Sequence, residues 1–146
     1  MDAVFDVENP AHAAARTRLD SELIAWLITT KADGTPHPAP VWFFWHDGVF
    51  TIVSEPDTIK VKHLRRGSKA TLHLDAGPLG DDVAIFHGDT RLIPDGGADF
   101  LARFREPYVA KYAAAIEAYG MPLEEIGRVF STVIEFTPTR LIAWGA

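Results

Sequence analysis

The stretch Glu22–Val53, ELIAWLITTKADGTPHPAPVWFFWHDGVFTIV, decides the fold. It contains three apolar, β-prone runs, at 22–30 (ELIAWLITT), 39–45 (APVWFFW) and 49–53 (VFTIV). The dipeptides Asp33-Gly34 and Asp47-Gly48 separate these runs, and Asp-Gly between apolar runs is a hairpin-turn signal. The pattern therefore predicts three strands joined in an antiparallel meander.

Four consecutive aromatic residues occupy the second of these runs, Trp42, Phe43, Phe44 and Trp45. Because side chains alternate along a strand, Trp42 and Phe44 point to one face and Phe43 and Trp45 to the other. One pair can fill the interior of a barrel. The other pair needs a cover, which can be a helix, a planar ligand or a second subunit.

The remaining sequence adds strands and peripheral helices. Asn9 and Pro10 are typical of a helix start, and the strands at 129–136 and 140–144 close the chain. A helical pattern over 98–119 contains Pro107, which predicts a break there. Further strands are expected at 70–75 and at 83–93, with a bend at Gly88. Six or seven hairpin-ordered strands with peripheral helices predict a mainly β fold, a small antiparallel barrel, in one domain over residues 1–146.

Positive charge is concentrated in one segment of an acidic chain. The formal net charge is -6, yet residues 60–69 hold five cations and no acid. Pro56 precedes two candidate N-caps, Asp57 and Thr58, and Gly67 provides a stop, so this segment predicts a basic helix. Its first amides, the hydroxyls of Ser54 and Thr58 and the nearby lysines suit a phosphate-sized anion. The alternative is a solvated basic helix face.

Several function classes lack support. The chain has no cysteine, no G-x-S-x-G, no H-E-x-x-H, no zinc spacing, no G-x-G-x-x-G and no Walker loop. His73 and His87 lie on predicted strands, either as hydrogen-bonded structural residues or as metal or haem ligands. No apolar run is long enough for a membrane span, and the N-terminus lacks the features of a signal peptide. A cytoplasmic protein is expected, and its acidity argues against general nucleic-acid binding.

The order of residues 29–42, 51–56, 60–66 and 70–74 resembles the pyridoxamine 5′-phosphate oxidase-like split β-barrel flavoproteins. It is most similar to their actinobacterial branch of deazaflavin (coenzyme F420)-dependent reductases, and 137–144 resembles the final strand. The resemblance implies a split barrel that forms a homodimer, with the cofactor in a groove between subunits. It places Lys60 on the cofactor phosphate, with Ser54, Thr58 and Lys62 around it. Arg65 and Arg66 either assist or brace the helix, and the strand carrying Pro38, Ala39, Val41 and Trp42 lies along the ring system, where its backbone amides could bond the ring edge.

The function implied is hydride transfer between reduced F420 and an unsaturated small molecule, with no catalytic side chain and no metal. FMN on the same fold is the first alternative, since both cofactors combine a ring with a phosphate. A binding protein without turnover is the second, for flavin or for haem held by His73 or His87. A single-strand nucleic-acid module, with aromatic residues stacking on bases, is the third.

Overall fold

A computed structural model describes residues 3–145, which form seven strands and five helices. The elements follow one another as α1 (Pro10–Ser21), β1 (Ala25–Thr30), β2 (Pro36–Val41), β3 (Phe44–His46), β4 (Val49–Ser54), α2 (Ile59–Arg65), β5 (Ala70–His73), β6 (Val83–Ile93), α3 (Gly97–Arg103), α4 (Arg105–Tyr119), α5 (Leu123–Val129) and β7 (Thr132–Trp144).

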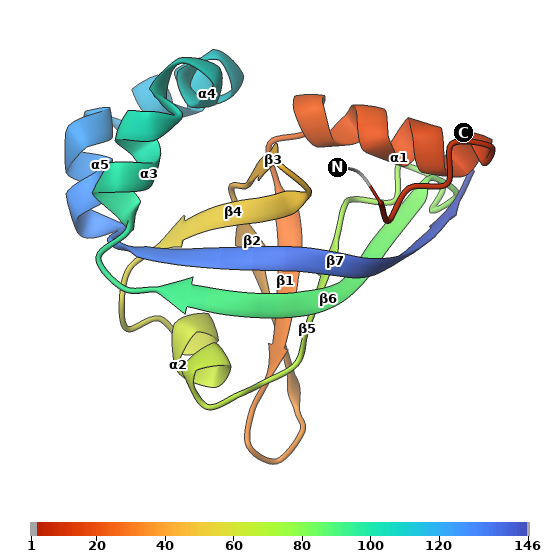
Figure 1. Cartoon of the computed structure of the whole chain (residues 1–146), viewed down its shortest axis with the longest axis horizontal. Helices are drawn as coiled ribbons and strands as arrows, with labels where there is room; N and C mark the ends of the chain where they lie inside the picture. Colours follow the sequence, from red (N-terminus) through yellow and green to blue (C-terminus); the bar gives the residue numbers. More distant parts are fainter. Residues whose placement is uncertain (1–2, 146) are drawn as a thin grey trace.

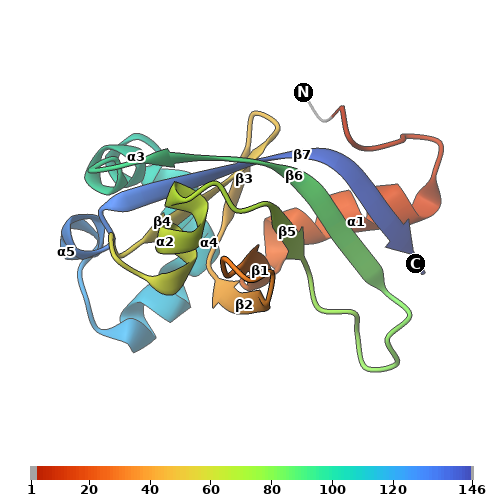
Figure 2. The ribbon, with the colours of Figure 1, turned by 90° about the horizontal axis from the view of Figure 1, so that it is seen from below.

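All seven strands belong to one antiparallel sheet, in the order β2-β1-β5-β6-β7-β4-β3. The long strands β6 and β7 lie side by side across the molecule, whereas β1 and β2 run steeply to them (Figure 1). Seen from below, the β1–β2 hairpin is viewed nearly end on while β6 and β7 cross the page (Figure 2). The sheet therefore curls into a half-barrel, and the predicted mainly β, split-barrel fold is confirmed.

The predicted three-stranded meander is wrong. The run 39–45 is two strands, β2 and β3, and these lie at opposite edges of the sheet. The two Asp-Gly hairpins exist, because β1 pairs with β2 and β3 with β4, but no ladder joins them into one unit. The chain leaves one edge at Trp42 and enters the other at Phe44.

Two side chains from α4 explain this interruption. The Tyr112 hydroxyl accepts a hydrogen bond from the Phe43 amide at 2.8 Å, and the Lys111 ammonium donates to the Phe43 carbonyl at 2.9 Å. The backbone of Phe43 is thus bonded to side chains rather than to a neighbouring strand, so the ladder can stop there. These partners lie almost 70 positions downstream, where local sequence gives no sign of them.

A bulge shapes the β6–β7 pair. The register shifts between His87 and Gly88, and a Cβ on Gly88 would lie 2.3 Å from the Thr137 carbonyl oxygen. The predicted bend at Gly88 is confirmed. The strands predicted at 129–136 and 140–144 are instead one strand, β7, which begins at Thr132. Pro138 does not divide it because the proline lies at the register shift, where prolines are tolerated in sheets.

The helices follow the predicted signals only in part. Asn9 caps α1 through its side chain, and α2 ends before Gly67 at φ +100°, as expected. The break expected at Pro107 lies instead at Phe104, between α3 and α4. Pro107 belongs to the first turn of α4, where a missing amide interrupts no helical hydrogen bond. Helix α5 ends at Val129, the residue at which the strand over 129–136 is expected to begin.

The fold has two apolar cores, and the four consecutive aromatic residues 42–45 are divided between them. Phe43 and Trp45 point into the first core, inside the curled sheet. Trp42 and Phe44 pack on the second core, which lies beneath α3, α4 and α5 at one end of the sheet (Figure 1). The predicted alternation is confirmed, and a helical layer is the cover that the second pair requires.

Candidate cofactor site

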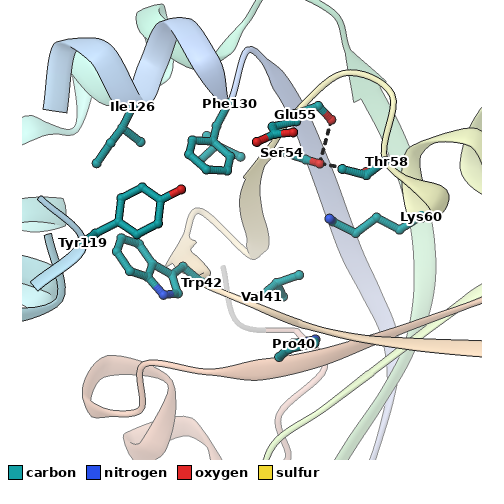
Figure 3. A pocket seen from close by; sticks show the side chains of 11 residues that line it. Pro40, Val41, Trp42, Ser54, Glu55, Thr58, Lys60, Tyr119, Ile126 and Phe130 are labelled. Carbon is teal, nitrogen blue, oxygen red and sulfur yellow. Dashed lines mark hydrogen bonds between the residues drawn. The ribbon is translucent and has the colours of Figure 1, made fainter. Parts of the chain in front are cut away.

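A pocket of about 420 Å³ lies where the sheet meets the helical layer. Its volume falls in the range of small-molecule sites. The end of β2, the end of β4 with the loop that follows, the start of α2, and the α4–α5 region all contribute to it (Figure 3). The lining residues are Pro40, Val41, Trp42, Val53, Ser54, Glu55, Thr58, Lys60, Tyr119, Ile126 and Phe130.

Lys60 supplies the only cationic side chain among these lining residues. It lies on the first turn of α2, and its ammonium points toward the pocket (Figure 3). Burial lowers the pKa of Lys60, while the nearby carboxylate of Glu55 acts in the opposite direction. A partly desolvated cation attracts an anion more strongly than a fully hydrated one.

Two hydroxyl groups lie beside this lysine. Ser54 is buried at the end of β4, and its hydroxyl donates to the Glu55 carbonyl at 2.9 Å. The Thr58 hydroxyl lies 3.1 Å from that of Ser54. Because the single Ser54 proton is engaged on the carbonyl, Thr58 is the donor to Ser54 in this pair, and its proton has to turn away from Ser54 to meet an anion in the pocket.

Aromatic and aliphatic side chains form the opposite wall. Trp42 stacks on Tyr112 with ring centroids 4.8 Å apart and planes 10° apart. Tyr119 meets Trp42 edge to face at 6.2 Å and lies 6.0 Å from Phe130. Figure 3 shows this apolar group facing the polar end formed by Ser54, Thr58 and Lys60. One anchored cation and one aromatic wall suit a ligand with a flat ring at one end and an anion at the other.

The structure brings together only part of the site expected from sequence. Ser54, Thr58, Lys60, Val41 and Trp42 line the pocket, whereas five other expected residues do not. Those five are Pro38, Ala39, Lys62, Arg65 and Arg66.

The two arginines have structural partners. Arg65 donates to the Pro56 carbonyl at 3.1 Å, and Arg66 donates to the Thr30 carbonyl at 2.6 Å. Arg66 therefore ties α2 to β1, which agrees with the bracing role considered for this pair. Lys62 is exposed on the helix. Of the five cations in 60–69, only Lys60 enters the pocket lining.

The register of β2 limits which backbone amides could border the ring. Pro38 and Pro40 have no amide hydrogen, and the register of β2 directs the amides of Ala39 and Val41 toward β1. The free edge of this strand consequently offers carbonyl oxygens.

Several lining residues had no sequence signal. Tyr119, Ile126 and Phe130 reach the pocket because α4 and α5 fold over the sheet. Nothing local distinguishes them from ordinary core residues. Glu55 and Pro40 do have a sequence signal, because each is adjacent to a residue that the sequence predicts for the site.

The two strand histidines lie outside this lining. His73 bonds the Leu74 carbonyl through Nδ1 at 2.9 Å and stacks on Trp26, while His87 is exposed on β6. Over residues 3–145, no three His, Asp or Glu side chains gather in a way that could hold a metal ion. No helix in that range is long and apolar enough to cross a membrane.

The seven-stranded, half-barrel sheet with a helical layer at one end defines the class of the fold, a split β-barrel. The family model for pyridoxamine 5′-phosphate oxidase matches residues 11–145, and the chain belongs to this family. No curated protein sequence gives a significant match.

Solved structures share the fold at low identity. An F420 reductase is 19% identical with a TM-score of 0.64, over 87% of this chain and 94% of its own. A conserved hypothetical protein from Mycobacterium tuberculosis is 20% identical with a TM-score of 0.66, over 97% and 87%. An FAD-binding protein from Mesorhizobium loti is 14% identical with a TM-score of 0.57, over 88% and 89%. These likenesses show the fold.

Proposed function

We propose that the protein is an F420-dependent oxidoreductase that transfers a hydride between reduced deazaflavin and an unsaturated small molecule. The observation that carries this proposal is the pocket itself, with Lys60 at one end and the Trp42–Tyr119 wall at the other. A cofactor built from a flat ring and a phosphate matches both ends. When bound, reduced F420 supplies a hydride, which an unsaturated acceptor takes up together with a proton from solvent.

The polar end of the pocket binds the phosphate. The Lys60 ammonium provides the charge, and the Thr58 hydroxyl provides a donor beside it. A charge-assisted contact of this kind is stronger than a neutral hydrogen bond. Glu55 limits how much negative charge this end accepts, because its carboxylate lies on the same wall.

The apolar end positions the reacting groups. Val41 and Trp42 border the ring from the sheet, and Tyr119, Ile126 and Phe130 cover the acceptor from the helical layer. Holding two reactants face to face and excluding water accelerates a transfer without any acid or base. This arrangement requires no catalytic side chain.

The comparisons keep one alternative open. The F420 reductase among the structural neighbours supports a deazaflavin, whereas the FAD-binding neighbour supports an ordinary flavin on the same fold. The second candidate function is therefore an FMN-dependent oxidoreductase that uses the same pocket.

Titration of the apoprotein with F420 and with FMN, followed by cofactor fluorescence, tests the proposal. We expect micromolar or tighter binding of F420 and weaker binding of FMN. Oxidation of reduced F420 by a panel of unsaturated acceptors then tests turnover. Preference for FMN would select the alternative, and binding of neither cofactor would contradict both.

We further propose that the protein works as a homodimer with the cofactor groove between the subunits. The outward face of the sheet carries partly or fully exposed apolar side chains from β1, β6 and β7, where a solvated sheet face would be polar. The register places them on one face, and Trp144 is 52% exposed. Pro40 pairs with Trp26 on this face and also lines the pocket, so a partner seated here would adjoin the site. The apolar residues are Trp26, Ile28, Val83, Ile85, Ile142 and Trp144.

A further inference from the structure

Three prolines alternate along the edge strand β2, at Pro36, Pro38 and Pro40. The strand pairs with β1 on one side only, so its other side is a free edge of the sheet. In an antiparallel pair, residues alternate between those that bond the neighbouring strand and those whose N–H and C=O point away from it. Which of these two sets contains the prolines decides what the free edge offers a ligand.

The turn before β2 determines this phase. The Lys31 amide donates to the Thr35 carbonyl at 2.9 Å, so these two residues form a hydrogen-bonded pair. The register continues from them with Thr30 opposite Pro36. Every second pair is hydrogen-bonded, which assigns the ladder bonds to Thr29 with His37, Leu27 with Ala39 and Ala25 with Val41.

The prolines therefore occupy the positions that face the free edge. Their carbonyl oxygens point outward, and the amide hydrogens that other residues would place there do not exist. From Pro36 to Pro40 the free edge is a row of acceptors without a donor. The next amide on this side is that of Trp42, which follows the end of the strand and also lines the pocket.

We propose that the missing amide at Pro40, on this edge, discriminates between cofactors and favours a deazaflavin over a flavin. This inference rests on the proposed function, since it concerns the ring bound in the same pocket. A flavin ring presents N5 and its pyrimidine carbonyls as acceptors, and each acceptor that leaves water without a new donor weakens binding. A deazaflavin has a C–H in place of N5 and so loses one bond fewer. Pro40 lines the pocket and is the edge residue that carries this discrimination.

Pro40→Ala tests the inference by adding one amide hydrogen to the edge inside the pocket. The expected result is that FMN binds about ten-fold more tightly while the Kd of F420 changes less than about two-fold. Pro36→Ala is the matched control, because it adds the same group to the same edge but does not line the pocket. It should change neither affinity.

A second control variant and a spectroscopic measurement on the bound cofactor distinguish a new hydrogen bond from a general disturbance of the strand. Pro38→Ala adds the same donor to the same edge but, like Pro36, lies outside the pocket lining, so it should also leave both affinities unchanged. The ¹⁵N chemical shift of N5 in bound, labelled FMN should move toward the hydrogen-bonded range in Pro40→Ala. An unchanged ratio of FMN to F420 affinity in Pro40→Ala would overturn the inference, as would the same change of ratio in Pro38→Ala.

Failure of the inference is separable from failure of the proposed function. The function is judged on whether the unmodified protein binds F420, and the inference on whether Pro40→Ala changes the ratio of FMN to F420 affinity. Unmodified protein that binds FMN more tightly than F420 would overturn the edge inference while leaving the flavin alternative standing. Protein that binds neither cofactor would overturn both.

Discussion

At the scale of single residues, Lys60 is the cation that makes the basic segment a candidate ligand site rather than only a charged surface. Residues 60–69 hold five cations, but the structure places one of them in the pocket and leaves Lys62 exposed on the same helix. Arg65 and Arg66 bond backbone carbonyls. The positive segment thus combines one candidate anion ligand with two residues that fix the position of α2.

Lys60→Ala should weaken cofactor binding by about 1–3 kcal/mol, or roughly five- to 150-fold in Kd, because a charge-assisted contact is lost. Fluorescence titration of the purified variant measures this. Lys62→Ala is the matched control, since it removes the same charge from the same helix outside the pocket. Equal losses in the two variants would show that general electrostatic attraction, rather than a phosphate contact at Lys60, accounts for binding.

Tyr112 has a different single-residue role, in holding the interrupted strand. Its hydroxyl donates to the Leu23 carbonyl at 2.7 Å and accepts from the Phe43 amide. Tyr112→Phe leaves both backbone groups without this partner and should lower the free energy of unfolding by about 1–3 kcal/mol. Chemical denaturation measures the change.

Tyr108→Phe is the control for that variant. Tyr108 is as deeply buried, 2% exposed, but its hydroxyl makes no hydrogen bond with residues 3–145. Its removal should cost much less stability. Similar losses in both variants would indicate that packing around the rings, not the bonds to Phe43 and Leu23, holds the segment.

At the scale of elements, Lys111 joins α4 to two other parts of the fold. Its ammonium donates to the Leu19 carbonyl near the end of α1 and to the Phe43 carbonyl, and it lies 3.6 Å from the centre of the Phe43 ring. Burial lowers the pKa of Lys111 from 10.5 to about 8. Between these two values the unfolded chain binds more protons at this lysine than the folded protein does.

The sign of the pH effect follows from that difference. The contribution of Lys111 to the free energy of unfolding should rise as pH increases from about 8 toward about 10, because the folded state sheds a buried charge. Urea denaturation of the unmodified protein and of Lys111→Met over this range checks it. The difference in stability between the two proteins should grow in favour of the unmodified protein. A difference independent of pH would mean that the lysine retains an ordinary pKa.

Helices and strands could be predicted where local sequence determines them, but not where residues distant in sequence do. Short-range signals worked, as in the Asn9 cap, the bend at Gly88 and the stop at Gly67. The joining of 39–45 into one strand failed because Tyr112 and Lys111, far along the chain, bond Phe43. The candidate site divides in the same way. Its polar end lies close together in sequence around α2, whereas Tyr119, Ile126 and Phe130 depend on how the helices pack.

The edge strand β2 shows one sequence feature that acts at two levels. Its alternating prolines leave no amide on the free edge, which denies an approaching strand the donors it would pair with. The same absence shapes what the adjacent pocket can bind. Alternating prolines are unfavourable in a central strand. In β2 they are compatible with its position at the sheet edge, next to the pocket.

At the scale of the whole molecule, the outward sheet face and the pocket meet at Pro40, and this links assembly to binding. Ile142→Glu places a charge within the apolar face that carries Trp26 and Ile85, and should convert a dimer to a monomer. Light scattering after size-exclusion chromatography measures the mass. Thr137→Glu, exposed earlier on β7 and beyond the bulge, is the control and should leave the assembly unchanged.

Cofactor affinity of the same Ile142→Glu variant decides where the groove lies. Ile142 does not line the pocket, so the substitution leaves the pocket residues of each chain unchanged. If the partner completes the site, the monomeric variant should bind the cofactor at least about ten-fold more weakly, since contacts from the second subunit are lost. A monomer that binds as tightly as the dimer would show that one chain holds the whole site. A variant that remains dimeric would show that this sheet face is not the dimer interface. The proposal that Lys60 binds the cofactor phosphate would be unaffected, because Lys60→Ala tests it separately.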